Sequence, residues 1–237
     1  MVTLADESGP ATCARHTLRQ LKAFMARQLD RNPSRGEFYP IDLRRIIEDV
    51  LHWRLDEVAA IGWTPDLEPI LGRCEYSEKR ILLATDPMPH KGERAYTVAH
   101  EIGHATMHKY TDCEIADHER TRALRRAERR ITDPAVALEI EADAFACELL
   151  MPEEAVRKQF ELVFGHKNVW INSHLARNVL QSHTGKRRAT SFAPADAFEV
   201  ARAAASYAGE AASSLITFFG TSAAATARRL LELGLIY

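Results

Sequence analysis

The stretch AYTVAHEIGHATMHKY, residues 95–110, contains the pattern His-Glu-x-x-His, from which the fold of this region can be predicted. Residues four apart lie on one face of an α-helix, so His100 and His104 can direct two imidazole nitrogens at one zinc ion. Glu101 lies about 100° around the helix from His100, where a general base reaches a water molecule without taking a ligand position. Three apolar residues have the spacing of a packed helix face: Val98, Ile102 and Ala105. The stretch therefore predicts a packed helix over residues 93–109.

A third ligand is expected from LEIEADAFACELLMP, residues 138–152, because a catalytic zinc takes three protein ligands and keeps one position open. The apolar stripe of this segment has helical spacing: Ala142, Phe145, Ala146 and Leu149. Glu139 lies about 60° to one side of that stripe, and Asp143 follows one turn later on the same flank. Glu141 lies about 100° to the other side, where a solvated face is expected. Helix phase thus favours Glu139 over Glu141 as the ligand, with Asp143 accepting the outer N–H of a ligating histidine.

Several polar residues near the motif are expected to have other roles. His108 continues the four-residue spacing but lies two turns, about 12 Å of rise, beyond His100, so it is expected to be a polar helix-end residue. Tyr96 lies one turn before His100 and is expected to pack in the core rather than donate to an oxyanion. His118 is expected to be exposed. The Arg-rich segment 120–130 is typical of a solvated face, with an anion or substrate contact as the alternative.

The two stretches together resemble the ImmA/IrrE family of zinc metallopeptidases. The family pattern is an aromatic residue before H-E-[IL]-G-H, followed by E-x-x-A-[DN]-x-F-A-x-x-L-L-M-P, and every element is present. The resemblance implies a gluzincin-like site with His100, His104 and Glu139 as zinc ligands; manganese or iron is also possible with these ligand types. It further implies cleavage of a transcriptional repressor, often a helix-turn-helix protein, in a stress-response or mobile-element switch.

We expect an α+β, mainly helical fold, with a zincin-like metallopeptidase domain over residues 1–165 and a C-terminal helical, helix-turn-helix-like region, 166–237, packed on it. Residues 1–11 are expected to form a loose tail. Two short apolar runs within 70–85 predict a hairpin and a small antiparallel sheet. Further helices are expected over residues 13–29, 41–51, 134–150 and 223–233. Ser222 is placed to cap the last of them.

The composition is that of an ordinary globular protein. The 237 residues are 46% hydrophobic and 27% charged, with a formal net charge of −2, which argues against a general affinity for nucleic acid or membranes. The N-terminus lacks the basic and apolar regions of a signal peptide, and no apolar stretch approaches a membrane span. The four cysteines are scattered, which fits reduced thiols. A cytoplasmic protein is therefore expected.

Two rival functions follow from other features. Arg228, Arg229 and the helix-turn-helix-like end suggest a DNA-binding regulator, although the acidic net charge makes direct DNA binding a weaker prediction. An inactive, metal-stabilised interaction module is the second rival. Glu101 counts against it, because a structural zinc needs no general base and usually has four protein ligands.

Overall fold

The computed structural model describes residues 9–29, 38–64, 67–86, 91–108, 134–184, 197–209, 211 and 213–237. These residues are mainly helical and include one three-stranded sheet. The chain divides into two compact units, Met1–Phe38 with Asp42–Leu149 and Tyr39–Ile41 with Leu150–Tyr237. The domain boundary after residue 165 stays a prediction. The predictions for His118, the segment 120–130 and most of the N-terminal tail fall outside the described residues.

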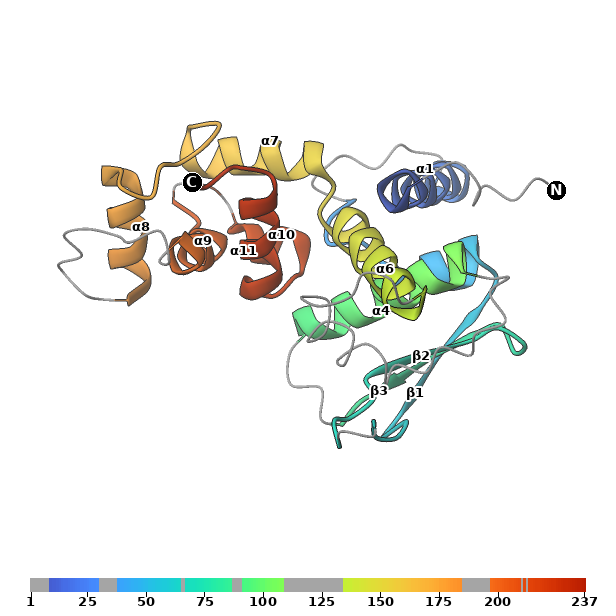
Figure 1. Ribbon diagram of the computed structural model, residues 1–237. Helices are drawn as coiled ribbons and strands as arrows, with labels where there is room; N and C mark the ends of the chain where they lie inside the picture. Colours follow the sequence, from blue (N-terminus) through green and yellow to red (C-terminus); the bar gives the residue numbers. More distant parts are fainter. Residues whose placement is uncertain are drawn as a thin grey trace. The chain divides into compact units, whose positions relative to one another are not determined.

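A small mixed sheet forms one layer of the first unit (Figure 1). Strands β2 (Gly72–Glu75) and β3 (Arg80–Ala84) pair as the predicted antiparallel hairpin. Strand β1 (Arg54–Val58) lies on the other side of β3 and runs parallel to it. The predicted antiparallel sheet is therefore mixed, and the prediction was wrong for β1. The sequence of β1, RLDEV, has three charged residues in five, so it carries no clear strand pattern, and its pairing with β3 supplies the order.

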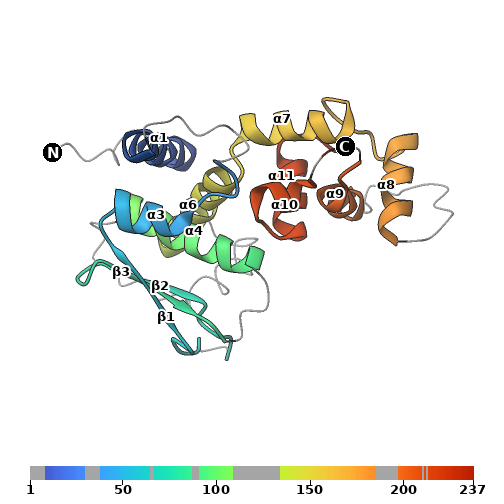
Figure 2. The same cartoon turned by 180° about the vertical axis from the view of Figure 1, so that it is seen from behind.

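Helix α4 (Lys91–Met107) packs against β2 and β3 and covers one face of the sheet, as Figures 1 and 2 show. The central strand β3 supplies the buried residues Ile81 and Leu83 to this layer. Helix α1 (Pro10–Leu29) also packs on α4. The helix predicted over residues 41–51 is shorter and consists of α3 (Leu43–Arg45), capped by Asp42, and the π-helical turn η2 (Ile46–Val50).

Helix α6 (Pro134–Leu150) has the predicted bounds and approaches α4 closely at Gly103. A Cβ atom at Gly103 would lie 3.1 Å from Phe145 Cδ1 and 3.3 Å from the Ala142 Cα atom. Part of this contact is backbone, which cannot yield unless the helices separate. The absence of a side chain at Gly103 therefore allows the close approach of the two helices that carry the histidine and acidic motifs.

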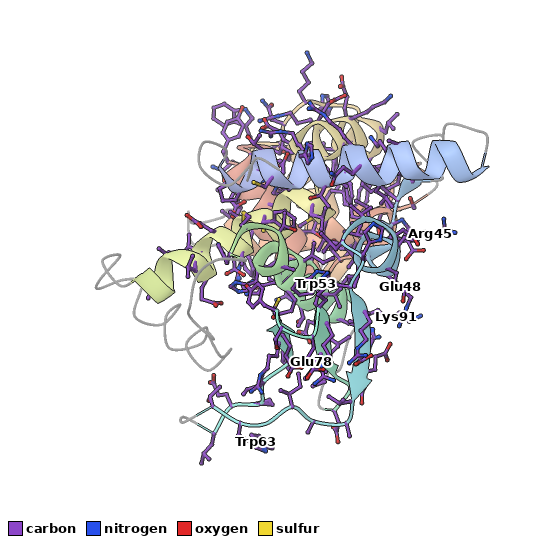
Figure 3. The ribbon with its side chains drawn as sticks, turned by 90° about the vertical axis from the view of Figure 1, so that its right-hand side faces the viewer. Arg45, Glu48, Trp53, Trp63, Glu78 and Lys91 are labelled. Carbon is purple, nitrogen blue, oxygen red and sulfur yellow. The ribbon has the colours of Figure 1, made fainter. Side chains whose placement is uncertain are left out.

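Two tryptophans near the sheet have opposite surroundings. Trp53 is buried and its ring meets that of Tyr76, in the turn between β2 and β3, edge to face at 5.8 Å. Trp63 is 64% exposed, and Figure 3 shows it at the end of this unit away from the helices. Trp53 thus holds the hairpin turn in place, which matters because Tyr76 also contacts helix α4.

The named elements in the described part of the second unit are all helices, and one isolated β-bridge pairs Val169 with Ile236. Its helices are α7 (Glu153–Phe164), α8 (His174–Thr184), α9 (Ala197–Ser206), α10 (Leu215–Phe219) and α11 (Ala223–Glu232). Helix α9 packs against α8 and α11. The hydroxyl of Ser222 accepts a hydrogen bond from the Ala225 amide, so the predicted N-cap of the last helix is confirmed. Within the described ranges, no helix combines the length and apolar character needed to cross a bilayer.

Candidate metal centre

Three buried side chains converge where α4 faces α6. His100 and His104 lie one turn apart on α4, and Glu139 lies on α6; they are 0%, 6% and 1% exposed. The Nε2 atoms of the two histidines are 3.0 Å apart. Glu139 places Oε2 3.2 Å from His100 Nε2 and Oε1 3.2 Å from His104 Nε2. Among the described residues, these three form a group that could hold a metal ion.

The spacing of the three groups suits a small cation with tetrahedral ligands. Ligands about 2.0–2.2 Å from a tetrahedral zinc lie about 3.3–3.5 Å from one another. The observed separations of 3.0 and 3.2 Å are close to that value. Glu139 Oε2 is also buried without a hydrogen bond of good geometry among the described residues. Since a buried carboxylate oxygen needs a compensating partner, the donor set fits a metal.

The charge state of Glu139 favours metal binding. Burial by itself would raise the pKa of Glu139, but the electrostatic influence of His100 and His104, each 3.2 Å from a carboxylate oxygen, outweighs it and holds the pKa of this carboxyl well below its usual value. The group is therefore an anion at neutral pH. A buried anion beside two imidazoles provides the mixed oxygen and nitrogen ligands that zinc accepts.

The outer nitrogen of His100 is held by a carboxylate. His100 Nδ1 lies 2.8 Å from Asp143 Oδ1, and the Tyr96 hydroxyl donates to the same oxygen at 2.9 Å. With its Nδ1–H donated to Asp143, His100 presents the lone pair of Nε2 to the centre. Asp143 thus occupies the position expected for the acceptor of the outer N–H. Tyr96 contributes a hydrogen bond to this acceptor, which the expectation of simple core packing did not include.

The outer nitrogen of His104 has a different partner. His104 Nδ1 lies 2.8 Å from His108 Nδ1, and His108 Nε2 lies 3.0 Å from Glu141 Oε2. His108 lies at the end of α4, as predicted, and is 3% exposed. Burial lowers the pKa of His108 below its ordinary value, although Glu141 opposes the shift, so the imidazole is neutral at pH 7. Glu141 lies at the surface, as helix phase predicted, and its carboxylate is hydrogen-bonded to the His108 imidazole.

Glu101 follows His100 on α4 and is buried against strand β2. A Cβ atom at Gly72 would lie 2.9 Å from Glu101 Oε1 and 2.8 Å from Thr97 Cγ2. Glycine at this position of β2 therefore leaves the space that the Glu101 carboxylate fills. The Tyr76 hydroxyl donates to the His104 carbonyl oxygen at 3.1 Å, which links the hairpin to the same turn of α4. Burial is the largest cause that raises the pKa of Tyr76, so its hydroxyl stays protonated and remains a donor.

Sequence reasoning missed the roles of Gly72, Tyr76 and His108. The first two lie in the hairpin, outside the motifs, and no local pattern relates them to α4. His108 did carry a signal, because a third histidine at four-residue spacing shares the face of His100 and His104. That signal points to a contact with His104, one turn away, rather than to the metal.

The comparison with protein families agrees with this geometry. The family model of the IrrE N-terminal-like domain, Peptidase_M78, matches residues 66–169, which include the hairpin, α4 and α6. Residues 66–169 belong to this family. The match supports a peptidase, and in this IrrE N-terminal-like domain the group of His100, His104 and Glu139 could bind a metal ion. Comparisons with curated proteins and with solved structures gave no match.

Proposed function

We propose that this chain is a zinc-dependent endopeptidase, with His100, His104 and Glu139 as the zinc ligands and Glu101 as the general base. One observation carries the proposal: the three buried groups converge at metal-ligand spacing, and Glu101 follows the first of them on the same helix. A three-ligand set leaves one coordination position open, which distinguishes catalytic from structural zinc sites. Membership of residues 66–169 in a peptidase family supports peptide-bond hydrolysis as the reaction.

Each residue of the centre would have a defined part in the reaction. When bound, zinc would supply Lewis-acid chemistry, polarising the scissile carbonyl and lowering the pKa of water toward about 7. Glu101 would accept the proton of the attacking water on its carboxylate and pass it to the leaving amine. Asp143 would hold the His100 ring in the tautomer that keeps Nε2 free of a proton.

Strand β2 offers a place for the substrate backbone. It lies at an edge of the described sheet, whose order is β1-β3-β2. Gly72 on this strand lies against the Glu101 side chain. An extended peptide that adds to a sheet edge forms main-chain hydrogen bonds and leaves alternate side chains free for recognition. We propose that β2 aligns the scissile peptide in this way, beside Glu101.

Gly72→Ala is expected to lower peptidase activity by about 10²-fold, because the new methyl group would displace the Glu101 carboxylate. The metal content should stay at the wild-type level, since Gly72 is not a ligand. Rates on a confirmed substrate and elemental analysis test the two parts separately. Gly9→Ala, where the added Cβ atom meets no other atom within 4 Å, serves as the control, and equal activity of Gly72→Ala and wild type would contradict the prediction.

The purified protein is expected to hold about one zinc ion per chain, since two imidazoles and one carboxylate form one open three-ligand site. Elemental analysis of the protein after gel filtration measures this ratio. The double variant His100→Ala, His104→Ala should hold no zinc. Metal-free wild type, or a fully loaded double variant, would contradict the assignment. Manganese or iron in place of zinc would keep the ligands and change only the ion.

The proposed substrate is a transcriptional repressor of the helix-turn-helix type, in a stress-response or mobile-element switch. Support for this part comes from the resemblance of the two motifs to the ImmA/IrrE family. The test incubates the zinc-loaded protein with the regulator encoded beside it and examines the products by mass spectrometry. A single cut that requires zinc is expected. An intact regulator under conditions in which wild type cleaves another protein would contradict this substrate.

The alternative function, DNA binding, was suggested in part by Arg228 and Arg229, and the surroundings of Arg229 give it little support. Arg229 Nε donates to the Met151 carbonyl oxygen at 3.1 Å, and its side chain is 12% exposed. This guanidinium is therefore used within the second unit, and Arg228 is the exposed member of the pair. Binding to duplex DNA that weakens steeply with salt would revive the alternative.

A further inference from the structure

We propose that His108 and Glu141 form a hydrogen-bonded chain that fixes the tautomer and orientation of His104, so that both are positioning residues of the metal centre. The inference rests on the proposed function, in which His104 binds zinc through Nε2. It assigns a role to two residues that lie outside the ligand set. It also explains why a third histidine, which cannot itself reach the centre, follows on the same helix face.

The hydrogen-bonded chain of His104, His108 and Glu141 has a single arrangement of protons that is compatible with a metal. His104 Nδ1 and His108 Nδ1 lie 2.8 Å apart, so one nitrogen must donate a proton and the other must accept it. If His104 Nε2 is to bind a metal, its proton must be on Nδ1, which then donates to His108. His108 Nδ1 must therefore be the acceptor, and the His108 ring carries its proton on Nε2, the nitrogen that faces the Glu141 carboxylate.

The same arrangement leads from His108 to a carboxylate. His108 Nε2–H points to Glu141 Oε2 at 3.0 Å, a normal length for an N–H donor to a carboxylate oxygen. The chain thus runs from the metal position through His104 and His108 to an anion at the surface, where the Glu141 side chain is 49% exposed. A carboxylate that accepts from an imidazole strengthens the basicity of the ligand that it supports.

The backbone around His104 supports this orientation. The His104 carbonyl oxygen accepts from the His108 amide at 2.9 Å and from the Tyr76 hydroxyl at 3.1 Å. These bonds hold the end of α4 in register, so the His108 ring lies one turn beyond that of His104, with ring centres 5.0 Å apart. The position of the His108 ring is therefore set by the last turn of α4.

The two ligating histidines consequently have unlike outer partners. His100 donates directly to a carboxylate, Asp143, whereas His104 reaches its carboxylate through a second imidazole. Both carboxylates come from α6, as does Glu139. Helix α6 therefore fixes the orientation of both imidazoles in addition to supplying the third ligand.

The test compares two substitutions of similar size. His108→Gln keeps an acceptor for His104 and a donor for Glu141, whereas His108→Leu fills the space without either. Zinc affinity, measured with Zn2+ alone by competition with a chromophoric chelator, should fall about 10–100-fold in His108→Leu. His108→Gln should recover most of that loss. Thermal unfolding of the metal-free variants shows whether each one is folded.

A double-mutant cycle tests the link to Glu141. Glu141→Gln should weaken zinc binding by less than His108→Leu, and it should have no further effect in the His108→Leu background, because the chain is already broken. Equal zinc affinity of His108→Leu and wild type would overturn the inference, as would equal weakening by leucine and glutamine. If wild type binds one zinc ion, either of these results contradicts only the roles of His108 and Glu141 and leaves the proposed function intact. A wild type that binds no zinc would overturn both.

Discussion

Glu101→Gln is expected to lose peptide hydrolysis by a factor of about 10²–10⁴ while the protein keeps its bound zinc. The glutamine side chain has nearly the same shape, so it fits the space beside Gly72 that the carboxylate occupies. An amide oxygen is far less basic than a carboxylate, however, and cannot accept the proton of the attacking water. His100, His104 and Glu139 are unchanged by the substitution, so zinc content should not fall. Initial rates on a confirmed protein substrate, with elemental analysis of the same sample, measure both effects.

The matched control for this variant is Glu93→Gln, which removes an exposed carboxylate from the first turn of the same helix. Its activity should equal that of wild type. A Glu101→Gln protein that cleaves at the wild-type rate would show that Glu101 is not the base. Loss of zinc from Glu101→Gln would instead show that the carboxylate contributes to the metal ligands.

Glu139→Ala is expected to cause the largest loss of zinc affinity of any single carboxylate substitution on α6. It removes one of the three proposed ligands and the only anion among them. It also leaves two imidazoles in a buried site, which provide no negative charge to balance the cation. The loss should exceed the about 10–100-fold effect that is typical when a residue outside the ligand set is removed. Competition with a chelator at fixed pH measures the affinity.

The decisive comparison is with the two neighbouring carboxylates of the same helix. Asp143→Ala removes the acceptor of the His100 N–H and should weaken zinc binding by about 10–100-fold. Glu141→Ala acts only through His108 from a half-exposed position and should have the smallest effect. If Glu141→Ala lost the metal and Glu139→Ala kept it, helix α6 would be rotated relative to the structure. The role of Asp143 would then fail as well.

Much of the centre could be predicted because its parts are local in the chain. The four-residue spacing of His100 and His104 places them on one helix face wherever that helix packs. The apolar stripe of the second helix indicates which flank is buried, so helix phase alone separates Glu139 and Asp143 from Glu141. The bounds of α6, the hairpin of β2 and β3, and the Ser222 cap were predicted for the same reason, since short-range rules define them.

Other features depend on contacts between distant residues, which no local pattern encodes. Strand β1 has a polar sequence and becomes ordered by pairing with β3, so a mixed sheet replaces the predicted antiparallel one. His108 contacts Glu141, which is 33 positions away along the chain. Gly72 is an unremarkable strand residue until the sheet places it against Glu101.

By itself, the sequence determined which side chains could bind a metal, which carboxylate could act as a base, and which helices carry them. It could do so because the helical repeat converts spacing directly into direction. The tertiary structure alone decided how close those side chains come. That distance depends on the approach of α4 and α6 at Gly103, where a missing Cβ allows backbone contact, and on the sheet that supports α4. Such distances are set by the close packing of residues that are far apart in the chain. That packing depends on the shapes of both helices, so neither segment of sequence alone can predict it.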